Sequence, residues 1–121
     1  MIKVLLVDDH VLIRKGIVLL LNNFPDIEVV GEADNGEEAI QLTYQHEPDV
    51  ILMDISIPDG LDGFTATKEI KKNFPKTKVV ILTMHNETAY IQQAIEVDAD
   101  GYILKNSEGG EMYEAIQTVF T

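Results

Sequence analysis

The chain contains no cysteine among its 121 residues, which excludes disulfide bonds and thiolate-based metal or redox chemistry. No apolar run approaches the roughly 20 residues that a membrane-spanning helix needs. A secretory signal pattern is also missing, because the short apolar run after Lys3 ends at two aspartates. We therefore expect a cytoplasmic protein that makes no use of a membrane.

Positive charge is scarce as well. The chain has 9 Lys and Arg residues against 21 Asp and Glu residues, for a net charge of -12. Binding to nucleic acid depends on Lys and Arg contacts to phosphate, so this chain by itself is not expected to bind DNA or RNA. The acidic excess either keeps the surface solvated or includes carboxylates that cluster around a cation. Their positions decide between these two interpretations.

The length and composition are those of one globular domain with an ordinary apolar core. Five short apolar runs alternate with segments of helical spacing, and the runs cover 3–7, 28–33, 50–53, 79–82 and 101–104. Continuous apolar runs of this length are typical of strands that are buried on both faces. The order predicts an α/β fold in which a parallel sheet carries helices on both sides.

The helical segments are expected at 11–23, from Asn35 onward, at 63–74, after Asn86 and after Ser107. Three of them have apolar residues at helical spacing, which we expect to face the core: Leu12, Ile13, Ile17, Leu20 and Leu21; Ile91, Ala94 and Ile95; and Met112, Ala115, Ile116 and Val119. The first of these segments also contains Val11, Val18 and Leu19, which is more than one buried face requires.

Polar residues follow four of the five apolar runs. They are Asp8 and Asp9, Asp54, Thr83 and Lys105. Ligands of open α/β sheets bind outside the carboxyl ends of the strands, so all of these side chains are expected at one edge. If the first and third strands are neighbours, the three aspartates converge.

Three adjacent carboxylates repel one another, and a hard divalent cation such as Mg²⁺ removes that repulsion. Mg²⁺ keeps open positions for phosphoryl oxygens, while Lys105 adds a positive charge and Thr83 a hydroxyl donor. A carboxylate beside the metal can attack phosphorus and form an acyl phosphate. Asp54 is the natural candidate, because Asp8 and Asp9 form a pair that can serve the metal.

Simpler roles exist for each residue alone. A single aspartate at the end of a strand usually caps a helix or forms a turn. That role does not explain why Thr83 and Lys105 lie at the same edge. The histidines at positions 10, 46 and 85 lack close ligand spacing and are not expected to bind a metal. His10 is expected to begin the first helix.

Four motifs together resemble the receiver domain of bacterial two-component response regulators, over essentially the whole chain. They are Val7-Asp8-Asp9-His10, Met53-Asp54-Ile55-Ser56-Ile57-Pro58, Leu82-Thr83-Met84-His85 and Gly101-Tyr102-Ile103-Leu104-Lys105. The Asp-Asp-His opening and the stretch 99–105 look most like the NarL/FixJ subfamily. Members of that subfamily carry a C-terminal LuxR-type helix-turn-helix output domain that binds DNA.

The resemblance implies a flavodoxin-like, doubly wound (βα)5 sheet of strand order 2-1-3-4-5. It implies that Asp54 accepts a phosphoryl group from a sensor histidine kinase. Mg²⁺, or Mn²⁺ in its place, would be bound by Asp9 directly, by Asp8 mostly through water, by Asp54 and by the backbone carbonyl of Ser56. Lys105 would contact the phosphoryl group.

The same resemblance implies a switch. Thr83 would turn toward the phosphoryl group, Tyr102 would rotate inward, and the surface around the fourth helix, fifth strand and fifth helix would change. His85 lies where side chains of relatives gate access to the phosphoryl group. Phosphorylation-dependent dimerisation through the first and fifth helices is expected, and the domain would control transcription through an output domain beyond residue 121.

Three alternatives remain open at this point. Residues 1–121 could be a stand-alone or unphosphorylated receiver that docks on another protein, an aspartyl-phosphate phosphatase, or a flavin-binding electron carrier. A phosphatase would need an acid where Ser56 stands, and a flavin carrier a hydroxyl-rich loop in place of Asp8-Asp9. The loop 58–63 is one residue longer than in the family pattern, and Asn106 replaces a proline of some relatives, which leaves the isomer of the Lys105–Asn106 bond open.

Overall fold

The computed structural model describes residues 1–55, 62–84 and 88–121 of the chain. Strands and helices alternate, as the apolar runs predicted. The strands are β1 (Ile2–Val7), β2 (Ile27–Ala33), β3 (Val50–Asp54), β4 (Lys78–Thr83) and β5 (Gly101–Leu104). The helices are α1 (Val11–Leu21), α2 (Gly36–His46), α3 (Gly63–Asn73), α4 (Thr88–Glu96) and α5 (Gly109–Phe120).

The five strands form one parallel sheet in the order β2-β1-β3-β4-β5. The predicted flavodoxin-like topology is therefore confirmed. β1 and β3 are direct neighbours, and Val7 lies opposite Met53 in the register. Because Asp8 follows Val7 and Asp54 follows Met53, the two acidic strand ends lie side by side.

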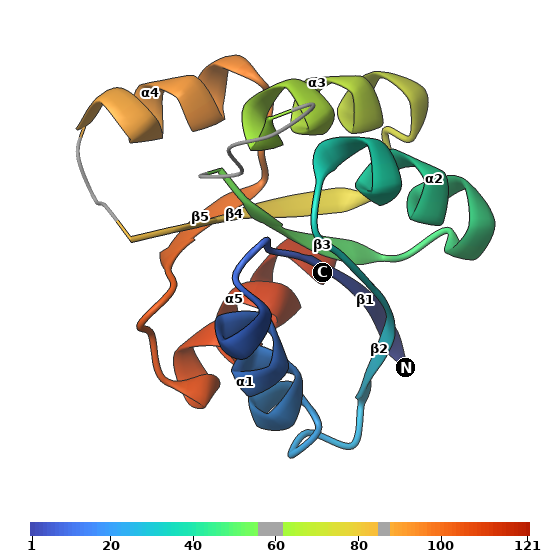
Figure 1. The fold of residues 1–121 in the computed structure, drawn as a ribbon, viewed down its shortest axis with the longest axis vertical. Helices are drawn as coiled ribbons and strands as arrows, with labels where there is room; N and C mark the ends of the chain where they lie inside the picture. Colours follow the sequence, from blue (N-terminus) through green and yellow to red (C-terminus); the bar gives the residue numbers. More distant parts are fainter. Residues whose placement is uncertain (56–61, 85–87) are drawn as a thin grey trace.

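Helices cover both faces of this sheet (Figure 1): α1 and α5 lie on one face, and α2, α3 and α4 on the other. Successive strand residues point to opposite faces. In β1, Val4 and Leu6 therefore pack toward α1 and α5, whereas Leu5 and Val7 pack toward α2 and α3. Burial on both faces explains why the strands read as unbroken apolar runs.

Two of the expected apolar faces differ from the structure. In α4 only Ala94 is buried, while Ile91 is 39% and Ile95 69% exposed, because α4 lies over the edge of the sheet and meets it along a narrow face. In α1 the expected core residue Leu12 is 86% exposed. Val18, which was expected to be surplus, is instead partly buried against the core.

Several local expectations hold. Asn35 caps α2 by accepting the backbone N–H of Glu38 at 2.8 Å. The Lys105–Asn106 peptide bond is trans, since no described bond is cis. The longest described helix, α5, has 12 residues, and none of the described helices has the length and apolarity that crossing a bilayer requires.

Candidate functional site

Three aspartates meet where β1 and β3 end. Asp8 and Asp54 have fully buried side chains, and the side chain of Asp9 is 24% exposed. The backbone N–H of Asp8 still bonds to Ala33 of β2 at 3.0 Å, which fixes the direction of the chain as it leaves the sheet. The predicted convergence of the three carboxylates is thus observed, and its cause is the pairing of β1 with β3.

Lys105 reaches this cluster from the end of β5. Its Nζ lies 3.1 Å from Asp8 Oδ2 and 3.0 Å from Asp54 Oδ2, and its side chain is 1% exposed. A buried ammonium is costly unless carboxylates surround it, and here two do. Because the cluster contains three carboxylates and Lys105 supplies one ammonium, it keeps an excess of negative charge.

The pKa of Asp9 is raised in this environment. Burial from water raises the pKa of Asp9, and so does its hydrogen bond with Asp54. The nearby His10 ring opposes this shift, and the charge of Asp54 adds to it. An elevated pKa means that the ionised form of Asp9 is disfavoured until a further positive charge arrives.

The residues present fit a divalent cation. Asp8 Oδ2 and Asp9 Oδ1 are buried, with the Lys105 ammonium 3.1 Å from the first and His10 Nδ1 3.2 Å from the second. Ligand atoms of Asp8, Asp9, His10 and Asp54 all lie within 4.8 Å of one another. Carboxylate oxygens at this spacing are the ligands that hard divalent cations prefer, so the cluster can hold a metal ion.

The predicted switch residues lie on adjacent strands. Thr83 ends β4 opposite Leu104 of β5 and is 1% exposed, and its carbonyl accepts the N–H of Lys105 at 2.8 Å. Tyr102 lies opposite Ile81 and packs, half-buried, against the core under α2, α3 and α4. Tyr102 therefore lies three residues before Lys105, which directly follows the end of β5.

Two predicted site residues, Ser56 and His85, lie outside the described residues, as does Asp59 of the long loop. The end of that loop is described. Asp62 caps α3 by accepting the backbone N–H of Thr65 at 2.8 Å. Its carboxylate is thus engaged in holding the helix.

Arg14 and Gly63 support the site and were not predicted from the sequence. The Arg14 guanidinium donates to the carbonyl of Asp8 at 2.7 Å and to Glu32 Oε1 at 3.0 Å, so it fastens the turn that presents the aspartates. A Cβ added to Gly63 would lie 2.2 Å from the carbonyl oxygen of Asp54. Only glycine allows α3 to start this close to the end of β3.

His10 is the third unpredicted member. It is the N-cap residue of α1, in agreement with its expected place at the start of that helix. Its backbone N–H donates to Asp8 Oδ1 at 2.8 Å, so Asp8 also has the turn-forming role considered above. Its ring turns inward, with Nδ1 at 3.2 Å from both Asp8 Oδ1 and Asp9 Oδ1. The sequence contains no signal for this ring orientation.

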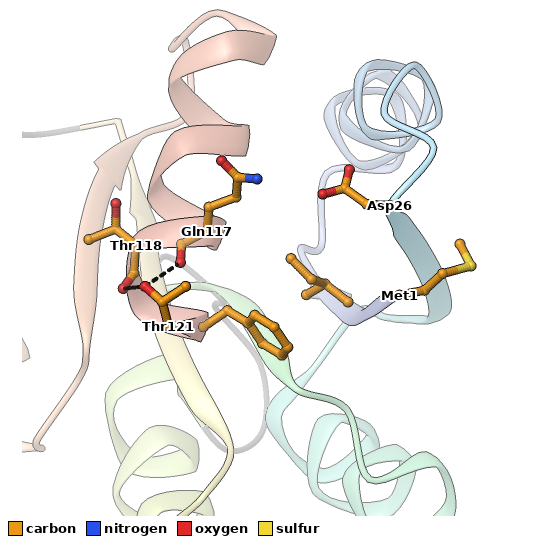
Figure 2. A pocket seen from close by; sticks show the side chains of 7 residues that line it. Met1, Asp26, Gln117, Thr118 and Thr121 are labelled. Atoms are coloured by element: carbon orange, nitrogen blue, oxygen red, sulfur yellow. Dashed lines mark hydrogen bonds between the residues drawn. The ribbon is translucent and has the colours of Figure 1, made fainter.

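A wide pocket lies away from this cluster (Figure 2). It measures about 560 Å³ and opens between the start of β1 and the end of α5, at the amino ends of the strands. Asp26 is its one carboxylate, and that group already accepts the Tyr113 hydroxyl at 2.6 Å. Without a second charged side chain, this pocket lacks the convergent chemistry of the aspartate cluster.

Comparison with known proteins agrees with this geometry. Residues 4–117 match the response regulator receiver domain family. The oxygen regulatory protein NreC of Staphylococcus carnosus is 42% identical over 118 residues, which is 98% of this chain and 54% of NreC. The chain therefore spans about half the length of the curated relatives that it matches.

Solved structures show the same likeness. The signal receiver domain of the response regulator NarL from Mycobacterium tuberculosis superposes with a TM-score of 0.93 at 35% identity, covering 98% of this chain and 95% of that one. A DNA-binding response regulator of the LuxR family from Staphylococcus aureus gives 0.92 at 30% identity, with 100% of both chains covered. Matched in sequence, fold and topology, the chain belongs to the response regulator receiver domain family, a family of signalling domains rather than turnover enzymes.

Proposed function

We propose that Asp54 is the phosphoacceptor of this domain and takes its phosphoryl group from the phosphohistidine of a sensor histidine kinase. The observation that carries this proposal is the position of Asp54, whose buried carboxylate lies 3.0 Å from the Lys105 ammonium beside two further aspartates. In the transfer, an Asp54 oxygen forms a bond to phosphorus while the phosphorus–nitrogen bond of the donor breaks. The electron pair of that bond leaves with the imidazole nitrogen.

Each neighbour has a role that follows from its charge. Lys105 moves its ammonium contact from the Asp54 carboxylate to an oxygen of the arriving phosphoryl group. Asp9, Asp8 and Asp54, with the backbone carbonyl of Ser56, are the proposed ligands of Mg²⁺ or Mn²⁺. When bound, the cation neutralises carboxylates and phosphoryl oxygens that would otherwise repel one another.

The proposed switch begins at Thr83. Its hydroxyl turns toward the phosphoryl group, and Tyr102 then rotates further into the space beside α4. Tyr102 is half-buried against the core here, so such a rotation would change the surface formed by α4, β5 and α5. His85 is proposed to gate access to the phosphoryl group.

The proposed output of the switch is dimerisation and DNA binding. It is inferred from the relatives and from the exposed apolar residues of α1. Val11, Leu12 and Leu19 are 58%, 86% and 69% exposed on that helix. We propose that this surface and α5 form a homodimer that tightens on phosphorylation. We further propose that a DNA-binding domain follows residue 121, that it regulates transcription, and that the protein works in the cytoplasm beside its kinase.

The test is intact mass spectrometry after incubation with acetyl phosphate, on the wild type and on Asp54→Asn. The proposal predicts a labile gain of one phosphoryl group that needs Mg²⁺ and is lost in the variant. Asp34→Asn, an exposed substitution, is the matched control and should be phosphorylated normally. If the wild type gains no phosphoryl group with Mg²⁺ or Mn²⁺, the domain is instead a docking module without phosphorylation.

A further inference from the structure

The ring of His10 is half-exposed, and its Nδ1 reaches the aspartate cluster. Its Nδ1 is 3.2 Å from Asp8 Oδ1, 3.2 Å from Asp9 Oδ1 and 4.0 Å from Asp54 Oδ2. It is also 3.3 Å from the Nζ of Lys105. One nitrogen therefore contacts groups that come from the ends of β1, β3 and β5.

These separations are close to those between neighbouring ligands of one cation. Ligand atoms at right angles around a metal with bonds of about 2.1 Å lie roughly 3.0 Å apart. The separations of Nδ1 from Asp8 and Asp9 need a change of only a few tenths of an ångström to meet that value. His10 is held in place for this by its own backbone, because its N–H bonds to Asp8 Oδ1 and its carbonyl accepts the N–H of Arg14 at 2.9 Å.

The second ring nitrogen of His10 is also placed in a way that is typical of a metal-binding histidine. Metal-binding histidines donate the N–H of their second ring nitrogen to a carboxylate, a carbonyl or water. The His10 side chain is 52% exposed, so water has access to its ring. Nδ1 can then keep its lone pair toward the cluster.

We propose that His10 Nδ1 is a ligand of the divalent cation in this domain, and that it shifts the preference of the site from Mg²⁺ toward Mn²⁺ and other cations that accept imidazole nitrogen. The inference rests on the proposed function, which supplies the cation site. Carboxylate, carbonyl and water ligands suit Mg²⁺, whereas imidazole suits the divalent transition metals. A cluster of three aspartates alone would give no such preference.

The test is pulsed EPR of Mn²⁺ bound to the domain, produced once with ¹⁴N-histidine and once with ¹⁵N-histidine. The expected result is a directly coordinated imidazole nitrogen whose signal changes with the isotope. That signal should persist in His46→Phe and His85→Phe, and disappear in His10→Phe, which keeps a ring of similar shape at the half-exposed position.

Calorimetric titration of the same proteins gives the second readout. His10→Phe should bind Mn²⁺ about tenfold more weakly or worse, while its Mg²⁺ affinity changes by less than about threefold. Mn²⁺ binding with no imidazole signal, or a signal lost in His85→Phe instead, would overturn the inference and leave the proposed function standing. A wild type that binds neither Mn²⁺ nor Mg²⁺ would overturn both.

Discussion

Lys105 Nζ lies 3.0 Å from Asp54 Oδ2, although β4 separates the strands that end at these two residues. The lysine spans the end of β4 and also reaches Asp8 Oδ2 at 3.1 Å. One ammonium thus joins the ends of β1, β3 and β5 in a buried site. This arrangement makes the stability of the domain depend on the charge at its functional edge.

Replacing Lys105 by Met should destabilise the domain. The change leaves Asp8 and Asp54 buried without their common counter-charge, and breaking a buried ion pair on one side costs about 3–5 kcal/mol. Urea unfolding without divalent cations measures the loss. Lys15→Met, at a 58% exposed lysine paired with Glu32, should cost less than about 1 kcal/mol. An equal, small loss for both variants would contradict the view that Lys105 neutralises the cluster.

A divalent cation should stabilise the folded domain. The proposed cation site exists only when the strands bring the carboxylates together, so Mg²⁺ at 100 times its Kd should add about 2.7 kcal/mol to the free energy of unfolding. Thermal unfolding in Mg²⁺ and in EDTA measures this difference. The stability difference between Mg²⁺ and EDTA should shrink strongly in Asp9→Asn and persist in the exposed control variant Asp34→Asn. An unchanged difference in Asp9→Asn would show that the ion binds elsewhere.

Two glycine substitutions should have opposite effects. Gly63→Ala would press a Cβ against the backbone of Asp54 and Ile55, at 2.2 Å from the Asp54 carbonyl oxygen, and should cost about 1–3 kcal/mol or more. Gly16→Ala, inside α1 with nothing within 4 Å of the added Cβ, should stabilise the domain by about 0.5–1 kcal/mol. Chemical denaturation of both variants tests the pair. A harmless Gly63→Ala would show that α3 does not need its close approach to β3.

The contribution of Glu32 to stability should depend on pH. Burial acts to raise the pKa of Glu32, but hydrogen bonds and charges from Lys15 and Arg14 outweigh it and lower the pKa below its ordinary value. A carboxyl whose pKa falls on folding stabilises the protein above the pKa of the unfolded chain and loses that effect as pH falls through the folded pKa. Glu32→Gln should therefore destabilise the domain by about 1 kcal/mol or less near pH 7.

Urea unfolding of the wild type and Glu32→Gln over a series of pH values measures this effect. The difference between the two proteins should be constant near neutral pH and vanish in acid, below the ordinary pKa range of glutamate. A stability difference that grows in acid would contradict this expectation, because the stabilising interaction would then be made by the protonated form of Glu32.

Much of the fold and of the site could be predicted because local sequence encodes it directly. Strands buried on both faces need unbroken apolar runs, and those runs end where Asp8, Asp54 and Lys105 begin. The convergence of these side chains then follows from parallel pairing, whose order the family resemblance supplied. The observed pairing of Val7 with Met53 confirms that step.

Other features depend on side-chain rotamers and on contacts between residues far apart in the sequence, which local sequence patterns do not indicate. The inward turn of the His10 ring depends on a side-chain rotamer, and the Arg14 contact with Glu32 joins residues 18 positions apart. The apolar pattern of α4 predicts a buried face at Ile91, Ala94 and Ile95, yet Ile95 is 69% exposed because the helix lies at the edge of the sheet. Periodicity shows which residues share a face and not how much of that face the sheet covers.

Chemical trapping of the acyl phosphate shows which residue carries the phosphoryl group, which is proposed to be Asp54. Borohydride reduces an aspartyl phosphate to homoserine, which peptide mass spectrometry locates in the sequence. After incubation with acetyl phosphate and Mg²⁺, we expect homoserine at position 54, none at Asp8 or Asp9, and none anywhere without Mg²⁺. Trapping at another aspartate, with residue 54 unmodified, would contradict this proposal.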